Sequence, residues 1–190
     1  MIFDITYFFY MIPALILMGL TSWYVKSTYN KWSKVRARSG LTGAQATERL
    51  IAAGGLYGVR VEGIAGEMTD HYDPRAKVLR LSQGVANVPS VAALAIAAHE
   101  LGHAMQDAEN YFPLRLRGAM VPMVNIGSNL GWILILIGLF LNIMQLAWVG
   151  VIAFAAGAVF ALATLPVEFD ASARAKRLLA DSGIISGQEE

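Results

Sequence analysis

The sequence predicts a mostly α-helical membrane protein with a small β element (class α+β) and three transmembrane helices. Of its 190 residues, 56% are hydrophobic and 15% are charged, whereas a soluble globular domain usually carries about a quarter charged residues. A chain of this length has too much surface per volume to hide that apolar excess in a soluble core. Two apolar regions separated by a polar stretch with strand-like patterns complete the basis for this class.

The overall charge and the missing amino acids exclude several classes of protein. The formal net charge is +1, which argues against a nucleic-acid partner because such binders need a strongly basic field. The chain has no cysteine, so disulfide scaffolds and thiolate metal sites are excluded. A metal site would have to use carboxylates and the three histidines, His71, His99 and His103.

The first apolar region, residues 5–25, predicts a transmembrane anchor that we assign to residues 1–25. Its 21 residues match a hydrocarbon core about 30 Å thick. It lacks the basic segment and the small-residue cleavage site of a secretory signal, so we expect an anchor that is not cleaved.

The polar stretch of residues 26–117 is expected to form a small domain at one side of the membrane. A helix is predicted over residues 42–53. Thr42 can cap its start, and the pair Gly54-Gly55 favours its end.

Two short strands and a long helix are predicted in the rest of this domain. The strands fall at residues 59–62 and 77–82, with a turn-rich segment at residues 70–74 between them. The helix is expected to run from Ser90 to about residue 110. Its apolar first half is too short to span a bilayer, so we interpret it as a buried core helix.

Residues 118–167 contain no ionisable side chain, and a segment of this length fits two spanning helices and a tight turn. We place the turn at residues 142–145. Gly127 and Gly131 form a G-x-x-x-G pattern that favours close packing of the two helices. The polar tail, residues 168–190, is expected to begin as a helix.

The distribution of basic residues predicts the orientation in the membrane. All 15 lysines and arginines lie between residues 26 and 177, and five of them lie within residues 26–38. The positive-inside rule then places the polar domain and the tail in the cytoplasm, and the N-terminus outside. Three spans would bring the segments on either side of the hairpin to the same face of the membrane.

The long helix carries two histidines and a glutamate at a spacing that suits a metal centre. The segment His99-Glu100-Leu101-Gly102-His103 has the pattern H-E-x-x-H. Histidines four residues apart lie on one face of a helix, so both imidazoles can reach one ion. Glu100 stands beside the first histidine, where it can take a proton from metal-bound water. The spacing therefore predicts two metal ligands and a general base.

A catalytic zinc ion needs a third protein ligand, for which we considered two glutamates. Glu109 would point about 240° away from His103 on an uninterrupted helix, so we reject it. Glu168 follows the last apolar segment directly, on the side of the membrane that the topology requires. The alternative interpretation of Glu168 is an ordinary interfacial acid at the start of a helix.

These residues resemble the YugP-like neutral zinc metallopeptidases and, in their pattern, the membrane gluzincins of the Ste24/HtpX type. The segments that carry the resemblance are residues 71–75, 78–82, 97–104 and 168–172. The resemblance implies a gluzincin-like fold and peptidase activity. It also implies one Zn²⁺ per chain, held by His99, His103 and Glu168, with Glu100 as the general base.

Ser172 is a departure from the wider gluzincin pattern. Four residues after the glutamate ligand, those enzymes usually place an aspartate that orients the first histidine. Asp170 or Asp107 could take over that task. His71 and Tyr72 have the chemistry to stabilise an oxyanion, although a histidine in such a turn is more often structural.

The second predicted strand is a candidate for substrate binding through Val78, Leu79, Arg80 and Leu81. Gluzincins that resemble this chain bind peptide along an exposed strand edge beside the zinc helix, and main-chain pairing gives affinity without much sequence preference. The alternative is an internal strand, and the sequence does not favour either.

We therefore predict a membrane-anchored, zinc-dependent endopeptidase in a bacterial plasma membrane, with its active site facing the cytoplasm. Its partners would be the lipid bilayer and a peptide or membrane-protein substrate, while its oligomeric state stays open. One alternative is a catalytically silent, metal-binding membrane scaffold or regulatory protein with a closed zinc site. Another is an intramembrane protease, which the lack of acidic residues within every predicted span disfavours.

Overall fold

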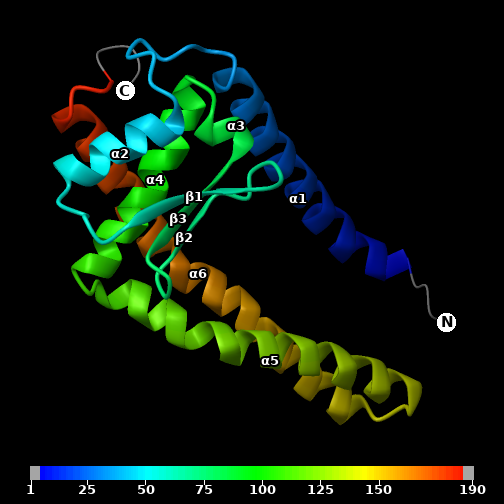
Figure 1. The fold of residues 1–190 in the computed structure, drawn as a ribbon. Helices are drawn as coiled ribbons and strands as arrows, with labels where there is room; N and C mark the ends of the chain where they lie inside the picture. Colours follow the sequence, from blue (N-terminus) through cyan, green and yellow to red (C-terminus); the bar gives the residue numbers. More distant parts are fainter. Residues whose placement is uncertain (1–4, 186–190) are drawn as a thin grey trace.

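Residues 5–185 of the chain are described by a computed structural model, shown in Figure 1. The predicted segments 1–25 and 168–190 reach beyond the described residues at the two ends. In chain order the elements are α1 (Ile5–Trp32), α2 (Gly43–Ala53), β1 (Arg60–Ile64), β2 (His71–Asp73), β3 (Val78–Ser82), α3 (Gln83–Ala86), α4 (Val91–Ala108), α5 (Phe112–Phe140) and α6 (Met144–Asp181). The predicted class, mostly helical with a small β element, is confirmed.

The three strands form one sheet in the order β1-β3-β2. Strand β1 pairs with β3 in parallel, and β2 pairs with β3 antiparallel, with Tyr72 opposite Leu79. The prediction of a plain turn at residues 70–74 is wrong, because three of those residues pair as β2. The turn begins at the end of this strand, where the Asp73 carboxylate accepts hydrogen bonds from the main-chain N–H groups of Arg75 and Ala76.

Strand β3 lies in the centre of the sheet, so the structure has the second of the two interpretations left open for it, an internal strand. It is hydrogen-bonded to a neighbouring strand on each side, and the side chains of Val78, Leu79 and Leu81 are buried in the core, with Arg80 half-buried. One edge of β3 is taken by the predicted first strand, β1, and the other by β2, which the sequence pattern did not reveal. The outer edge beside the long helix belongs to β2 instead, which contacts α4.

Local capping signals position α2 and α4 as the sequence predicts. Thr42 accepts a hydrogen bond from the Gln45 main-chain N–H, while the Gln45 side chain accepts one from the Thr42 main chain. This reciprocal pair satisfies two N–H groups that the first turn leaves without helical partners. Ser90 caps α4 in a similar way, accepting from the N–H of Ala93 at 3.2 Å.

The core of the polar domain lies between the sheet, α2, α4 and the last turns of α6. Its largest fully buried side chains include Leu50, Leu79, Leu81, Leu94 and Leu101. The buried face of α4 follows from its sequence, because alanines and leucines recur at helical spacing on that face. Helix α4 therefore stands inside the domain, as expected, and gives the functional residues a rigid support.

Helices α5 and α6 form a long antiparallel hairpin that extends from the domain (Figure 1). A Cβ atom at Gly131 would lie 2.7 Å from the Gly150 carbonyl oxygen, so glycine is needed where the two helices cross. Close packing within the chain is thus confirmed for this glycine of the G-x-x-x-G pattern. The second helix of the predicted hairpin continues into the predicted tail, because α6 runs without interruption from Met144 to Asp181.

Two helices of the described residues are long and apolar enough to cross a membrane, α5 and α6. Most of their large apolar side chains are exposed, among them Phe140, Ile152 and Leu162, as expected for surfaces that face lipid. Helix α1 is not one of these two, so the third predicted span is not confirmed. Figure 1 shows α1 leaving the domain toward the same side of the view as the hairpin.

Candidate metal centre

Three side chains from two helices converge to form a candidate metal centre. His99 and His103 lie on α4, and Glu168 lies on α6 just beyond its uncharged segment. The Nε2 atoms of His99 and His103 lie 3.2 and 3.4 Å from the same oxygen of Glu168, Oε2. One ligand atom from each residue falls within 4.8 Å of the others, so the three could hold one metal ion. The predicted set of two histidines and Glu168 is brought together.

A glycine allows α6 to reach this position. A Cβ atom at Gly102 would overlap the Ala171 carbonyl oxygen and lie 3.0 Å from the carbonyl carbon of the same residue. A side chain at this position would therefore push α6 away from α4. Because Ala171 lies one turn beyond Glu168, the same crossing determines how close Glu168 comes to the two imidazoles.

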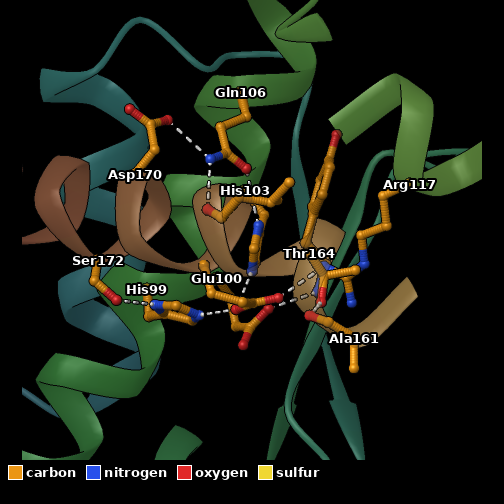
Figure 2. Close-up of polar contacts among 12 residues, drawn as sticks. His99, Glu100, His103, Gln106, Arg117, Ala161, Thr164, Asp170 and Ser172 are labelled. Atoms are coloured by element: carbon orange, nitrogen blue, oxygen red, sulfur yellow. Dashed lines mark hydrogen bonds and ion pairs between the residues drawn. The ribbon is translucent and has the colours of Figure 1, made fainter. Parts of the chain in front are cut away.

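Each imidazole has a separate partner at its second nitrogen (Figure 2). His99 Nδ1 lies 3.1 Å from the Ser172 hydroxyl, and His103 Nδ1 lies 3.0 Å from Gln106 Oε1. With both Nδ1 atoms occupied, the Nε2 atoms are the ones directed toward Glu168. Such outer partners fix ring orientation in metal sites.

The structure places the two aspartates that were candidates for orienting a histidine away from His99. Asp107 Oδ2 accepts a hydrogen bond from the Tyr72 hydroxyl at 2.8 Å. Asp170 Oδ2 accepts one from Gln106 Nε2 at 2.8 Å, and the other end of the same amide contacts His103. Asp170 is therefore connected with His103 through Gln106. Among the described side chains, the contact at His99 Nδ1 belongs to Ser172 itself.

Glu100 is half-buried beside the two imidazoles. Burial raises the pKa of its carboxyl above the usual range, while the nearby His103 and His99 act in the opposite direction. Its Oε2 accepts a hydrogen bond from the main-chain N–H of Tyr72 at 3.0 Å. This N–H faces α4 rather than β3, so β2 directly positions the carboxylate.

A cleft of about 490 Å³ opens over these residues. One wall comes from β2 and α4, including His71, Tyr72 and Glu100, and the opposite wall comes from the first turns of α5. Arg117 of α5 lines that wall and donates from its Nη1 to Glu168 Oε1 at 2.8 Å. The site is therefore open on one side, with room for a molecule next to the three candidate ligands.

Both candidates for oxyanion stabilisation line the cleft, but both side chains are engaged elsewhere. His71 Nδ1 lies 2.8 Å from the Thr69 carbonyl oxygen, and its Nε2 lies 3.4 Å from Arg80. The Tyr72 hydroxyl is bonded to Asp107, and burial together with this bond raises the Tyr72 pKa well above its usual range. Neither role is tested by this arrangement.

Sequence reasoning missed Gln106 and Arg117 as parts of the site. Gln106 lies three residues after His103, on the same face of α4, and this spacing could have indicated a partner. Arg117 directly precedes the uncharged hairpin, and Glu168 directly follows it. The two residues therefore lie at the same end of the hairpin, and this was the available signal for the ion pair.

Comparison with known proteins identifies the family of this chain. A family model described as "Putative neutral zinc metallopeptidase" matches residues 7–190. The chain is 45% identical over 176 residues to "Putative membrane protease YugP" of Bacillus subtilis (strain 168), covering 91% of this chain and 78% of that relative. No solved structure matches the chain. Because the family match spans nearly the whole sequence, the chain belongs to the neutral zinc metallopeptidase family that this description names.

Proposed function

We propose that this protein is a membrane-anchored zinc endopeptidase of the gluzincin type. The observation that carries the proposal is the meeting of His99, His103 and Glu168 beside Glu100, in a cleft that is open to a substrate. Family membership supports the same reaction class. A scaffold with a closed structural zinc site is disfavoured, because the cleft borders all three candidate ligands.

The donor atoms in this centre suit zinc. Two imidazole nitrogens and one carboxylate oxygen form a common ligand set for a catalytic zinc ion, one per chain here. Each imidazole has its Nδ1 bonded elsewhere and its Nε2 directed toward Glu168. When bound, zinc would polarise the scissile carbonyl and lower the pKa of an attacking water toward about 7.

Glu100 is the proposed general base. Its carboxylate would accept the proton of the attacking water and later deliver it to the leaving amine. A raised pKa suits this role because a stronger base takes the proton more readily. The Tyr72 main-chain N–H holds one carboxylate oxygen and leaves the other free to receive the proton.

Strand β2 is the proposed docking edge for the peptide, in place of the interior β3. It is the outer strand on the side of α4, and His71 and Tyr72 line the cleft. Because the Tyr72 main-chain N–H is taken by Glu100, an extended peptide could pair with this edge through the Tyr72 carbonyl oxygen and lie beside Glu100. Such pairing would make the enzyme tolerant of many peptide sequences.

The place of the cleft beside a candidate spanning helix supports substrates at or near the bilayer surface. The cleft is lined by the first turns of α5, a candidate spanning helix. We propose that α1 supplies a third span, because its exposed surface carries Leu17, Leu20 and Trp23 among other apolar residues. In this arrangement residues 26–117 and 168–190 form one cytoplasmic peptidase unit at a bacterial plasma membrane, and the N-terminus lies outside.

The test is the variant Glu100→Gln in the purified full-length protein. The amide keeps the shape of the side chain but cannot act as a base, so we expect zinc binding to persist and cleavage of an unstructured protein such as casein to be lost. In the zinc-binding assay, the control is His71→Gln, which changes a histidine of the cleft wall that is not a candidate ligand and should leave zinc binding unchanged. Undiminished proteolysis by Glu100→Gln would refute the mechanism, and a wild-type protein that binds zinc without cleaving any peptide would favour the scaffold.

A further inference from the structure

Gln106 is a fully buried polar side chain that connects α4 with α6 beside the metal centre (Figure 2). Its relative exposure is 0%, so its amide must find all its partners within the protein. The Nε2 atom donates to the Val167 carbonyl oxygen and to Asp170 Oδ2, both at 2.8 Å. The Oε1 atom lies 3.0 Å from His103 Nδ1.

The chemistry of these partners permits one orientation of the amide. A carbonyl oxygen and an ionised carboxylate can only accept hydrogen bonds, so the NH₂ group of Gln106 must face them. Asp170 accepts a further bond from Arg174 Nε at 2.6 Å, which favours its ionised form. The amide oxygen is therefore left facing His103, and His103 Nδ1 must be the donor.

We propose that Gln106 is a positioning residue that holds His103 with its proton on Nδ1 and its Nε2 free for the metal. This inference rests on the proposed function in one respect, namely that His103 is a metal ligand. A hydroxyl can donate or accept, so Ser172 does not impose the same restriction on His99. The two histidines are therefore held differently, one by an amide of fixed direction and one by an adjustable hydroxyl.

The same side chain also positions the third candidate ligand. Val167, whose carbonyl Gln106 binds, directly precedes Glu168. Asp170, the second acceptor, is held in turn by Arg174, which pairs with Glu109 at 2.7 Å. A single buried amide thus links the orientation of His103 to the turn of α6 that carries Glu168.

A first experiment measures the histidine directly. The full-length protein in detergent, labelled with ¹⁵N-histidine and loaded with Zn²⁺, has three histidines to assign. We expect His103 to bind through Nε2 and to carry a slowly exchanging proton on Nδ1. Binding of the metal through Nδ1, or a freely exchanging Nδ1 proton, would overturn the proposal, and this readout does not depend on any variant.

A second experiment measures zinc affinity by competition with a chelator. Gln106→Leu removes the acceptor while keeping similar bulk, and we expect affinity to fall about 10–100-fold, as for other lost outer partners of metal ligands. Thr47→Val is the matched control, because Thr47 is equally buried and bonds only the Gly43 carbonyl of its own helix among the described contacts. It should leave zinc affinity and the His103 signal unchanged.

Gln106→Met separates the hydrogen bonds from packing. Its side chain is about as long and as flexible as that of glutamine, but it offers no amide to His103, Val167 or Asp170. We expect this variant to bind zinc as weakly as Gln106→Leu, because both lack the acceptor at His103 Nδ1. The proposal fails if either variant binds zinc as tightly as the wild type.

The proposed function can fail separately from this inference. If His103→Ala binds zinc as tightly as the wild type, His103 is not a ligand, and this inference falls with that assignment. Loss of zinc binding in His103→Ala together with full affinity in Gln106→Leu would leave the metal centre standing and overturn the role of Gln106 alone.

Discussion

Gly102 of α4 packs directly against the main chain of Ala171 in α6, and this contact brings Glu168 to the two histidines. A Cβ atom at Gly102 would lie 3.1 Å from the Ala171 Cα atom and closer still to its carbonyl group. The neighbours are main-chain atoms of a continuous helix, so they cannot move aside as a flexible side chain would. Helix α6 would have to shift as a body.

Gly102→Ala is therefore expected to damage both stability and metal binding. Overpacking of this kind costs about 1–3 kcal/mol, and displacement of α6 should weaken zinc affinity because Glu168 moves with it. Chelator competition and thermal unfolding in detergent measure the two effects. Gly19→Ala is the control, since a Cβ atom at Gly19 meets no atom within 4 Å; equal zinc affinity in Gly102→Ala and the wild type would contradict this account of the crossing.

Ser172 gives a second prediction, based on its 3.1 Å contact with His99 Nδ1. Ser172→Ala removes that partner, and we expect zinc affinity to fall about 10-fold. This is the lower end of the range for losing a hydrogen-bond partner of a metal ligand. Ser172→Asp offers a charged acceptor that strengthens the basicity of the imidazole, so its zinc affinity should equal or exceed that of the wild type. Ser182→Ala, which removes a hydroxyl bonded to the Leu179 carbonyl, should change nothing, and an unaffected Ser172→Ala would refute the role of Ser172.

Local signals account for what the sequence predicted correctly. The cap at Thr42 and the cap at Ser90 act within three residues of the helix start, so a short window of sequence contains the whole interaction. The spacing of His99 and His103 is likewise local, because the helix itself brings them together. Glu168 was predictable as a candidate because the two spans of the hairpin would return the chain to the side of the membrane where His99 and His103 lie.

Interactions between distant segments account for what the sequence did not reveal. Strand β2 has only three residues and depends on pairing with β3, so its own composition indicated a turn. The Gln106 amide reaches Val167, 61 positions away, and Arg117 reaches Glu168 across 51 positions. Neither distance leaves a pattern within one element, and both contacts depend on how α4, α5 and α6 cross.

The proposed membrane orientation can be measured because the chain has no native cysteine. Gln145→Cys places a thiol at the exposed tip of the hairpin, and Glu48→Cys places one on the exposed surface of α2. In intact bacterial cells, a membrane-impermeant maleimide should label the first variant and reach the second only after lysis. The reverse pattern would contradict a cytoplasmic active site.

The third span is tested in the same cells by an epitope fused to the N-terminus. If α1 crosses the membrane, a protease added outside should remove the epitope, while the thiol of Glu48→Cys stays inaccessible to the impermeant maleimide. An epitope that is protected together with residue 48 would show that α1 does not span, and would leave the hairpin of α5 and α6 as the membrane anchor.

The hydrogen bond from the Tyr72 main chain to Glu100 can be separated from the Tyr72 side chain by comparing two variants. Tyr72→Pro removes both the side chain and the N–H that Glu100 accepts at 3.0 Å, whereas Tyr72→Ala removes the side chain alone. Proline is tolerated on an edge strand where the N–H points away from the sheet, so β2 should still form. Both variants lose the bond to Asp107 equally, and zinc affinity should be the same in the two. We expect Tyr72→Pro to cleave peptide at least 10-fold more slowly than Tyr72→Ala, because one hydrogen bond to a charged group contributes about 1.5–3 kcal/mol. Equal rates would mean that this N–H does not position the base.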